Sequence, residues 1–153
     1  MNKLIHDGIW IGSTAGILSG LALLIFGARE NGSAFAPTNA VSHWLWRGRA
    51  FWKDDFSAKY SVLGYLIHHT MSIFWGTIHA AVHGQGKDAG QPAQALARGA
   101  ATAAAACFVD YQLTPKRLTP GFEHRLSKPA LTGVYIAFGA GLALACIALA
   151  KKR

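Results

Sequence analysis

The sequence predicts an all-α integral membrane protein, a four-helix bundle with an amphipathic interfacial helix in its first loop. The 153 residues are 52% hydrophobic, and the mean hydropathy is +0.24, above the usual range of soluble chains. Residues 8–28 and 129–150 contain no charged side chain, and runs of about 20 such residues cross roughly 30 Å of hydrocarbon. The weaker apolar segments 60–83 and 93–113 complete the four predicted spans of a single membrane domain, residues 1–153.

The first apolar segment is expected to be a retained span and not a cleaved signal peptide. Lys3 precedes it with Asp7 close behind, and the run is longer than a signal core. Four spans place both termini and the 84–92 loop on one side, and the loops 29–59 and 114–128 on the other. Basic residues favour cytoplasmic long loops, but the terminal Lys151-Lys152-Arg153 opposes that bias. The orientation therefore stays open.

The formal net charge of +8 comes from basic residues scattered near the ends of the predicted spans. This distribution fits anionic lipid headgroups better than nucleic acid, which favours basic residues grouped on one face. Cys107 and Cys146 both fall within predicted spans, and we interpret them as small apolar packing residues.

Small residues recur at four-residue spacing in three of the predicted spans. Such rows let membrane helices approach closely, because lipid offers no hydrophobic force to bring the helices together. We expect the rows to pack the bundle, with an interface to a partner or a second copy as the alternative. The rows are Gly8, Gly12, Gly16 and Gly20; Gly99, Ala103 and Cys107; and Gly133, Ala137, Gly141 and Ala145.

The first long loop carries a helix-entry signal, Pro37-Thr38-Asn39, with Thr38 or Asn39 as the cap. Apolar residues then follow at helical spacing among basic ones, which predicts an amphipathic helix at about residues 39–53 in the headgroup plane. Its tryptophans, Trp44, Trp46 and Trp52, are expected at the membrane interface. The alternative is an irregular loop anchored by the same tryptophans.

After the third span, a repeated Leu-Thr-Pro predicts a turn, a short helix near residues 121–126 and a helix restart around Ser127.

Histidines form a polar stripe on the second predicted span. At about 100° per residue, one face carries His68, Ser72, Trp75, His79 and His83, while His69 points away. A polar row turned toward lipid is unfavourable, so the stripe is expected to face the bundle, a cavity or a partner.

Four interpretations of the histidines stay open, and the favoured one makes them neutral imidazoles that form interhelical hydrogen bonds. In the second, His79 and His83 form half of a metal site that His6 and Asp7 complete. In the third, His68 or His69 ligates haem b, with its counterpart in a symmetric dimer or with His43 as the second ligand. The fourth is a proton or ion path. No bound cofactor is the leading expectation, with a metal ion or haem as alternatives.

Motifs of nucleophilic catalysis are missing from the sequence. It contains no G-x-S-x-G elbow, no basic residue next to either cysteine and no phosphate-binding glycine loop. We therefore assign no catalytic residue and do not expect the chain to act as an enzyme by itself.

The stretch "HHTMSIFWGTIHA" is followed by a small-residue helix, by "FVDYQLTPKRLTPGFEHRLS" and by a closing helix that opens near Val134-Tyr135. This layout, from Tyr60 to about Phe138, resembles small uncharacterised bacterial inner-membrane proteins, including the YagU-like group. The resemblance implies a multi-pass protein of the bacterial inner membrane and carries no catalytic motif.

The expected function is that of an accessory or scaffold subunit that acts by helix packing, in a larger membrane complex or as a homo-oligomer. Its expected partners are membrane lipid and either other membrane subunits or copies of itself, and no nucleic acid. The alternatives are a histidine-based metal- or haem-binding redox protein and a small transporter or proton pathway.

Overall fold

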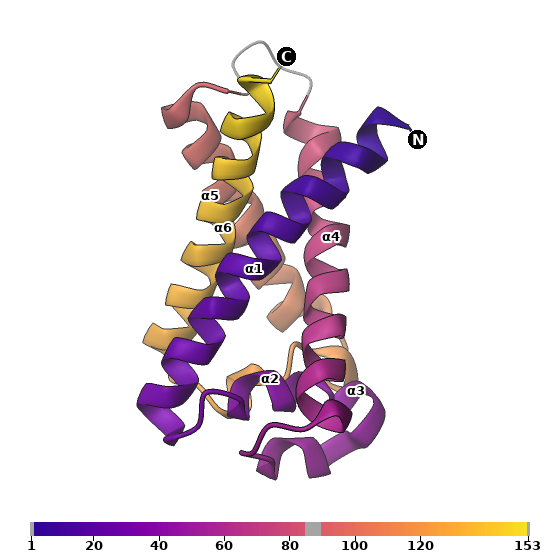
Figure 1. The fold of residues 1–153 in the computed structure, drawn as a ribbon, viewed down its shortest axis with the longest axis vertical. Helices are drawn as coiled ribbons and strands as arrows, with labels where there is room; N and C mark the ends of the chain where they lie inside the picture. The colour runs from indigo at the N-terminus through magenta and orange to yellow at the C-terminus, as the bar shows by residue number, and fades with distance from the viewer. Residues whose placement is uncertain (1, 85–89, 153) are drawn as a thin grey trace. The chain divides into compact units, whose positions relative to one another are not determined.

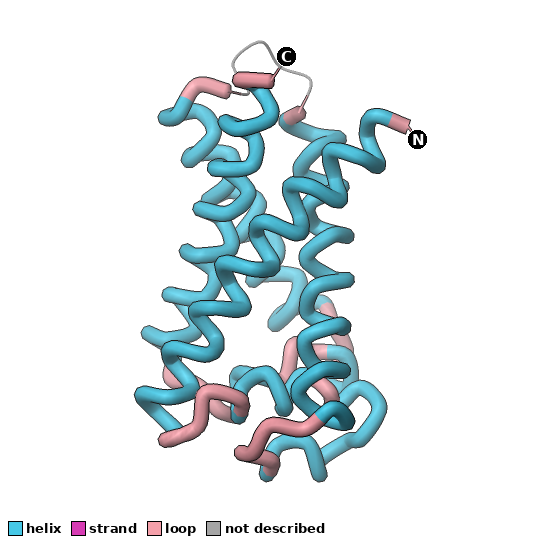
Figure 2. Tube along the Cα trace, viewed as in Figure 1, coloured by secondary structure: helices cyan, strands magenta, loops and turns pink. Residues whose placement is uncertain are grey.

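The computed structural model describes residues 2–84 and 90–152, in which the regular structure is helical and no strand occurs (Figures 1 and 2). This confirms the predicted helical class. Residues 85–89 of the predicted 84–92 loop and the terminal Arg153 lie outside the described residues. The α-helices are α1 (Lys3–Asn31), α2 (Ala36–Val41), α3 (His43–Trp46), α4 (Leu63–His83), α5 (Pro92–Phe108) and α6 (Lys128–Ala150).

Two helices of the described chain, α1 and α6, are long and apolar enough to cross a membrane, judged by length and composition. They contain the first and last predicted spans. The second and third predicted spans correspond to α4 and α5, each with an adjoining π-helical turn, η2 (Ala58–Val62) and η3 (Val109–Leu113).

Local side-chain signals set several helix ends. The side chain of Asn2 accepts the N–H of Leu4 at 3.0 Å, which caps the start of α1. Ser127 accepts the N–H of Ala130 at 3.3 Å in the same way, so α6 starts where the sequence predicts. Gly32, which follows α1, has φ 66°, a left-handed conformation that glycine adopts at little cost.

The predicted interfacial helix at 39–53 is not continuous. Instead the chain forms α2, α3 and a 3₁₀ helix, η1 (Arg47–Trp52). Arg47 adopts φ 52° and ψ −148°, which no α-helix can contain, so the chain turns there. The predicted cap is also wrong, because α2 already begins at Ala36 and both Thr38 and Asn39 are buried inside it.

The segment after α5 follows the prediction. It forms η3, then a 3₁₀ turn η4 (Lys116–Leu118), a second 3₁₀ turn η5 (Phe122–His124), and finally α6. The predicted short helix near 121–126 and the restart around Ser127 are therefore confirmed.

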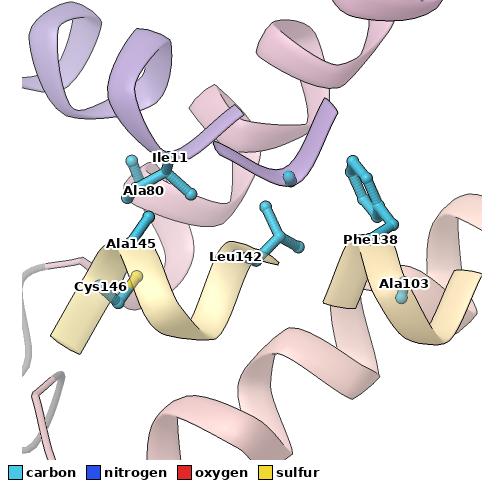
Figure 3. Close-up of a cluster of buried hydrophobic side chains, with 8 residues drawn as sticks. Ile11, Ala80, Ala103, Phe138, Leu142, Ala145 and Cys146 are labelled. Atoms are coloured by element: carbon cyan, nitrogen blue, oxygen red, sulfur yellow. The ribbon is translucent and has the colours of Figure 1, made fainter. Parts of the chain in front are cut away.

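The chain divides into two compact units. Unit 1 comprises Met1–Ser19, His69–Cys107 and Tyr135–Arg153, and unit 2 comprises Gly20–His68 and Phe108–Val134. The buried core of unit 1 contains many small side chains (Figure 3), which allow helices to approach one another closely. Its members are Ile11, Ala15, Ala80, Ala103, Phe138, Leu142, Ala145 and Cys146.

In unit 1, α1 and α4 approach too closely for a side chain at Gly12. A Cβ atom there would lie 2.5 Å from the carbonyl oxygen of Ser72, and a Cβ atom at Gly76 of α4 would clash with the backbone of Gly12. Gly8 meets Thr77, and Gly16 lies against Ser72. This part of the first predicted small-residue row therefore packs within the chain.

The row on α6 is used in the same way. In unit 1, a Cβ atom at Gly141 would lie 2.5 Å from the Cα of Ala15. In unit 2, Gly133 faces the ring of Phe26, and Gly20 of α1 faces the ring of Tyr65. Ala137 is half-buried, whereas Ala145 belongs to the core of unit 1.

The third row packs against a residue that sequence reasoning missed. Gly99 of α5 and Gly139 of α6 meet, and a Cβ atom at 139 would lie 3.0 Å from the carbonyl oxygen of Gly99. Gly139 lies outside the four-residue row that the sequence indicated on this helix. Ala103 is buried and Cys107 is half-buried.

Replacing Gly12 by Ala is expected to destabilise the protein by about 1–3 kcal/mol, because the methyl group must displace backbone atoms of α4. Thermal unfolding in mild detergent, followed by circular dichroism, measures this. Gly48→Ala is the matched control, since a Cβ atom at 48 meets nothing within 4 Å. Equal midpoints for the two variants would contradict the close approach.

Candidate functional site

His79 lies in the interior of unit 1 with 1% of its surface exposed. Its Nδ1 shares a hydrogen bond with the hydroxyl of Thr102 at 2.8 Å, which joins α4 to α5. The His83 ring lies one turn further along α4, with the two ring centroids 5.1 Å apart. The contact to Thr102 is the interhelical hydrogen bond that the favoured interpretation of the histidine stripe requires.

The predicted metal ligands do not form one group. His6 is exposed and lies 3.4 Å from the carboxylate of its neighbour Asp7. The cation of Arg98 interacts with both His79 and His83, which opposes the binding of a metal cation there. Within the described residues, no three His, Cys, Asp or Glu side chains are placed to hold one metal ion.

The two remaining histidines of the stripe region belong to different units. In unit 2, the ring of His68 has aromatic neighbours, with centroids 6.4 Å from Tyr65 and 6.5 Å from Phe122. In unit 1, the Nδ1 of His69 lies 3.1 Å from the position that a Cβ atom of Gly16 would take. His69, predicted to point away from the stripe, therefore also meets α1, and the haem interpretation stays a prediction.

Asn39 is the central polar side chain of unit 2 and is fully buried. Its amide donates to the carbonyl oxygens of Lys53 at 2.9 Å and Asp55 at 3.0 Å. Its own oxygen accepts from the hydroxyl of Ser61 at 2.6 Å. One side chain thus fixes α2 to the loop after η1 and to the start of the α4 region.

Arg125 is the second anchor of unit 2. Its guanidinium donates to the side chain of Asn31 at 3.0 Å, to the carbonyl of Phe51 at 2.6 Å and to the carboxylate of Asp54 at 2.5 Å. Asn31 in turn donates to the carbonyl of Arg125 at 2.7 Å. The planar fork of arginine suits such multiple contacts, which hold three chain segments together.

His43 is buried in unit 2 with a fixed orientation. Its Nδ1 donates to the carbonyl of Ala40 at 2.9 Å, its ring packs on Phe51 at 5.0 Å, and Gly121, at φ 94°, lies close enough that a Cβ atom would clash with the ring. Burial lowers the pKa of His43, although the hydrogen bond to Ala40 and the nearby carboxylate of Glu123 raise it. The ring is therefore neutral, and folding stability falls as the pH drops below the ordinary value for histidine.

Two buried acceptors of unit 2 have no hydrogen-bond partner among the described residues, the Nε2 of His43 and the Oε2 of Glu123.

The three predicted interfacial tryptophans have two different roles. Trp44 is half-buried, donates to the carbonyl of Thr119 at 2.9 Å and accepts from Arg117 at 3.2 Å, so it joins α3 to the loop after α5. Trp46 and Trp52 are 36% and 84% exposed. Only these two present aromatic surface of the kind found at membrane interfaces.

Comparison with known proteins finds no matching family model, no matching curated protein and no matching solved structure. The resemblance to the YagU-like group therefore stays a prediction, and function has to be inferred from the chain itself.

Sequence reasoning missed Asn39 and Arg125 as anchors. The partners of Asn39 lie 14 to 22 residues away, and the side-chain and backbone partners of Arg125 lie 71 to 94 residues away. A signal does exist, because both side chains carry several N–H donors and lie in segments of short helices and turns, where many carbonyls lack a helical partner.

Asn39→Asp is expected to destabilise unit 2 by about 3 kcal/mol. The amide N–H groups that donate to the carbonyls of Lys53 and Asp55 are replaced by a carboxylate oxygen, which cannot donate to them. Trypsin sensitivity of the bonds after Arg47, Lys53 and Lys59 measures the loss. The exposed Gln112→Glu provides a control with the same chemical change. Cleavage of Asn39→Asp at the wild-type rate would contradict the role of Asn39 as an anchor of these segments.

Proposed function

We propose that this chain is a multi-pass integral membrane protein that acts by helix packing. It serves as an accessory or scaffold subunit of a larger membrane complex, or of an oligomer of its own copies. The observation that carries the proposal is the distribution of side-chain size. Small residues line the helix contacts, whereas large apolar residues cover the outer faces.

This distribution is clearest on α1. Its contact face carries Gly8, Gly12 and Gly16, whereas large aliphatic residues at spacings of four or eight are exposed. Such an apolar face is unfavourable in water and is expected where lipid surrounds the helix. The exposed residues are Ile5, Ile9, Ile17, Leu21 and Ile25.

We assign α4 and α5 as further spans for the same reason. The polar Ser72 and His79 of α4 are buried in unit 1, whereas its exposed side chains include Leu66, Phe74 and Val82. The helix α5 continues into η3, and residues 92–113 reach roughly 30 Å at about 1.5 Å per residue.

The polar side chains of unit 2 support a scaffold role. Asn39 and Arg125 use their donors on backbone carbonyls and on Asp54. In unit 1, His79 is engaged with Thr102. These groups fix helices and loops in place, which is the property that a packing subunit needs. The bacterial inner membrane is the proposed location, following the layout resemblance.

The number of spans is tested by the sidedness of single cysteines at Asp55→Cys and Gln91→Cys, made after Cys107 and Cys146 are replaced by Ala. With four spans, an impermeant maleimide labels one position in right-side-out vesicles and the other in inverted vesicles. Both positions are described and exposed. Labelling of both from the same side would mean that α1 and α6 span the membrane without α4 and α5.

The packing role is tested by native mass spectrometry of the protein released from its own membrane in mild detergent. A hetero-complex or a defined homo-oligomer is the expected result. A monomer that carries the mass of a haem or metal ion would overturn the role and support the redox alternative. Ile17→Ala and Ile25→Ala shorten exposed side chains and test whether the outer face of α1 contributes to the assembly.

A further inference from the structure

An aromatic–lysine cluster, formed by Trp46, Lys53, Lys59 and Tyr60, lies on the surface of unit 2. The ammonium group of Lys59 is 4.6 Å from the centroid of the Trp46 ring and 5.5 Å from that of Tyr60. The ammonium of Lys53 is 5.7 Å from the Tyr60 ring. Rings at these distances attract the two cations and restrict their motion.

Three hydrogen bonds hold the backbone of this cluster. The indole N–H of Trp46 donates to the carbonyl of Lys59 at 2.9 Å. Asn39 donates to the carbonyl of Lys53, and the Ser57 hydroxyl accepts the N–H of Tyr60 at 3.2 Å. Two lysines from segments on either side of a loop are therefore positioned before any partner binds, which reduces the entropy that binding loses.

Exposed apolar side chains accompany these cations in the same segment. Trp52 is 84% exposed, Phe56 61% and Leu45 56%. Arg47 and Arg49 are exposed as well. A soluble anion such as inorganic phosphate satisfies the cations but leaves the apolar side chains in water, whereas a phospholipid satisfies both.

The acidic side chains of the segment oppose this charge only in part. Asp54 pairs with Arg125 at 2.5 Å, and Asp55 is the other carboxylate between Trp46 and Tyr60. The basic residues of the segment are Arg47, Arg49, Lys53 and Lys59. The remaining surface is cationic and attracts lipids with a net negative headgroup.

We propose that the aromatic–lysine cluster is a binding site for acidic phospholipid, with the phosphate of the headgroup between Lys53 and Lys59 and the lipid glycerol region against Trp46 and Trp52. The inference rests on the proposed membrane location. It adds a specific ligand to the general expectation that tryptophans lie at the interface.

The test uses the full chain in nanodiscs that hold equal amounts of phosphatidylglycerol and phosphatidylcholine. Native mass spectrometry gives the ratio of the two lipids retained on the released protein. Wild type is expected to prefer phosphatidylglycerol, and K53Q/K59Q to lose about 25-fold of that preference, because each of the two basic residues contributes about fivefold. K53R/K59R keeps the charge and is expected to retain the preference.

The matched control is K151Q/K152Q, which removes the same charge in unit 1 and leaves the cluster intact. It also removes one lysine–tryptophan contact, as K53Q/K59Q does, since the ammonium of Lys152 lies 5.2 Å from the centroid of the Trp10 ring. Equal losses of phosphatidylglycerol preference in K53Q/K59Q and K151Q/K152Q would overturn the site, because any pair of surface lysines would then account for the preference. An unchanged preference in K53Q/K59Q would overturn it as well.

Two further results separate the possible failures. Displacement of phosphatidylglycerol by millimolar inorganic phosphate would reduce the cluster to a general anion site and overturn the lipid proposal. Extraction of the protein from membranes by alkaline carbonate would instead overturn the membrane location. If the protein resists carbonate extraction and K53Q/K59Q keeps the wild-type lipid selectivity, the lipid-site proposal fails and the membrane location stands.

Discussion

Unit 1 depends on a backbone approach that leaves no room for a Cβ atom, at Gly12 of α1 against Ser72 and Gly76 of α4. Once these two helices meet at glycine, their larger side chains cannot occupy the contact and must lie elsewhere. Accordingly, the large side chains of Ile9 and Ile17 on α1 and of Phe74 on α4 are exposed. The positions of the small residues therefore determine both which helix faces pack together and which faces present apolar surface.

Unit 2 follows a different rule, because it consists of short helices and turns as well as helix ends. Such segments leave carbonyl oxygens that no helix satisfies, and a buried carbonyl without a donor costs roughly 1–3 kcal/mol. Asn39 and Arg125 supply donors to Lys53, Asp55 and Phe51. The loops keep their shape because two side chains with several donors each reach segments that are remote in sequence.

The same contrast explains how far the sequence could predict the structure. The long helices, the restart at Ser127 and the small-residue rows depend on neighbours within a few positions, and local periodicity indicates them. The burial of Asn39 depends on contacts with Lys53, Asp55 and Ser61, which a local pattern does not reveal, so its prediction as a helix cap is wrong. The break at Arg47 lies in its backbone conformation, which the apolar periodicity does not indicate. Gly139, which meets Gly99, lies outside the regular four-residue row of α6, so spacing alone does not indicate it.

The histidine stripe shows why averaged hydropathy is a poor guide to α4. Its polar Ser72 and His79 lower the mean of the helix, yet both are buried in unit 1, and His79 bonds to Thr102 of α5. Lipid would meet the exposed Leu66, Phe74 and Val82 instead. A membrane helix is constrained by what its outer face presents, and polar residues on the inner face cost little once they are hydrogen-bonded. The four histidines between Lys59 and Gly84 are therefore compatible with a membrane span, and His79 contributes to the packing of unit 1.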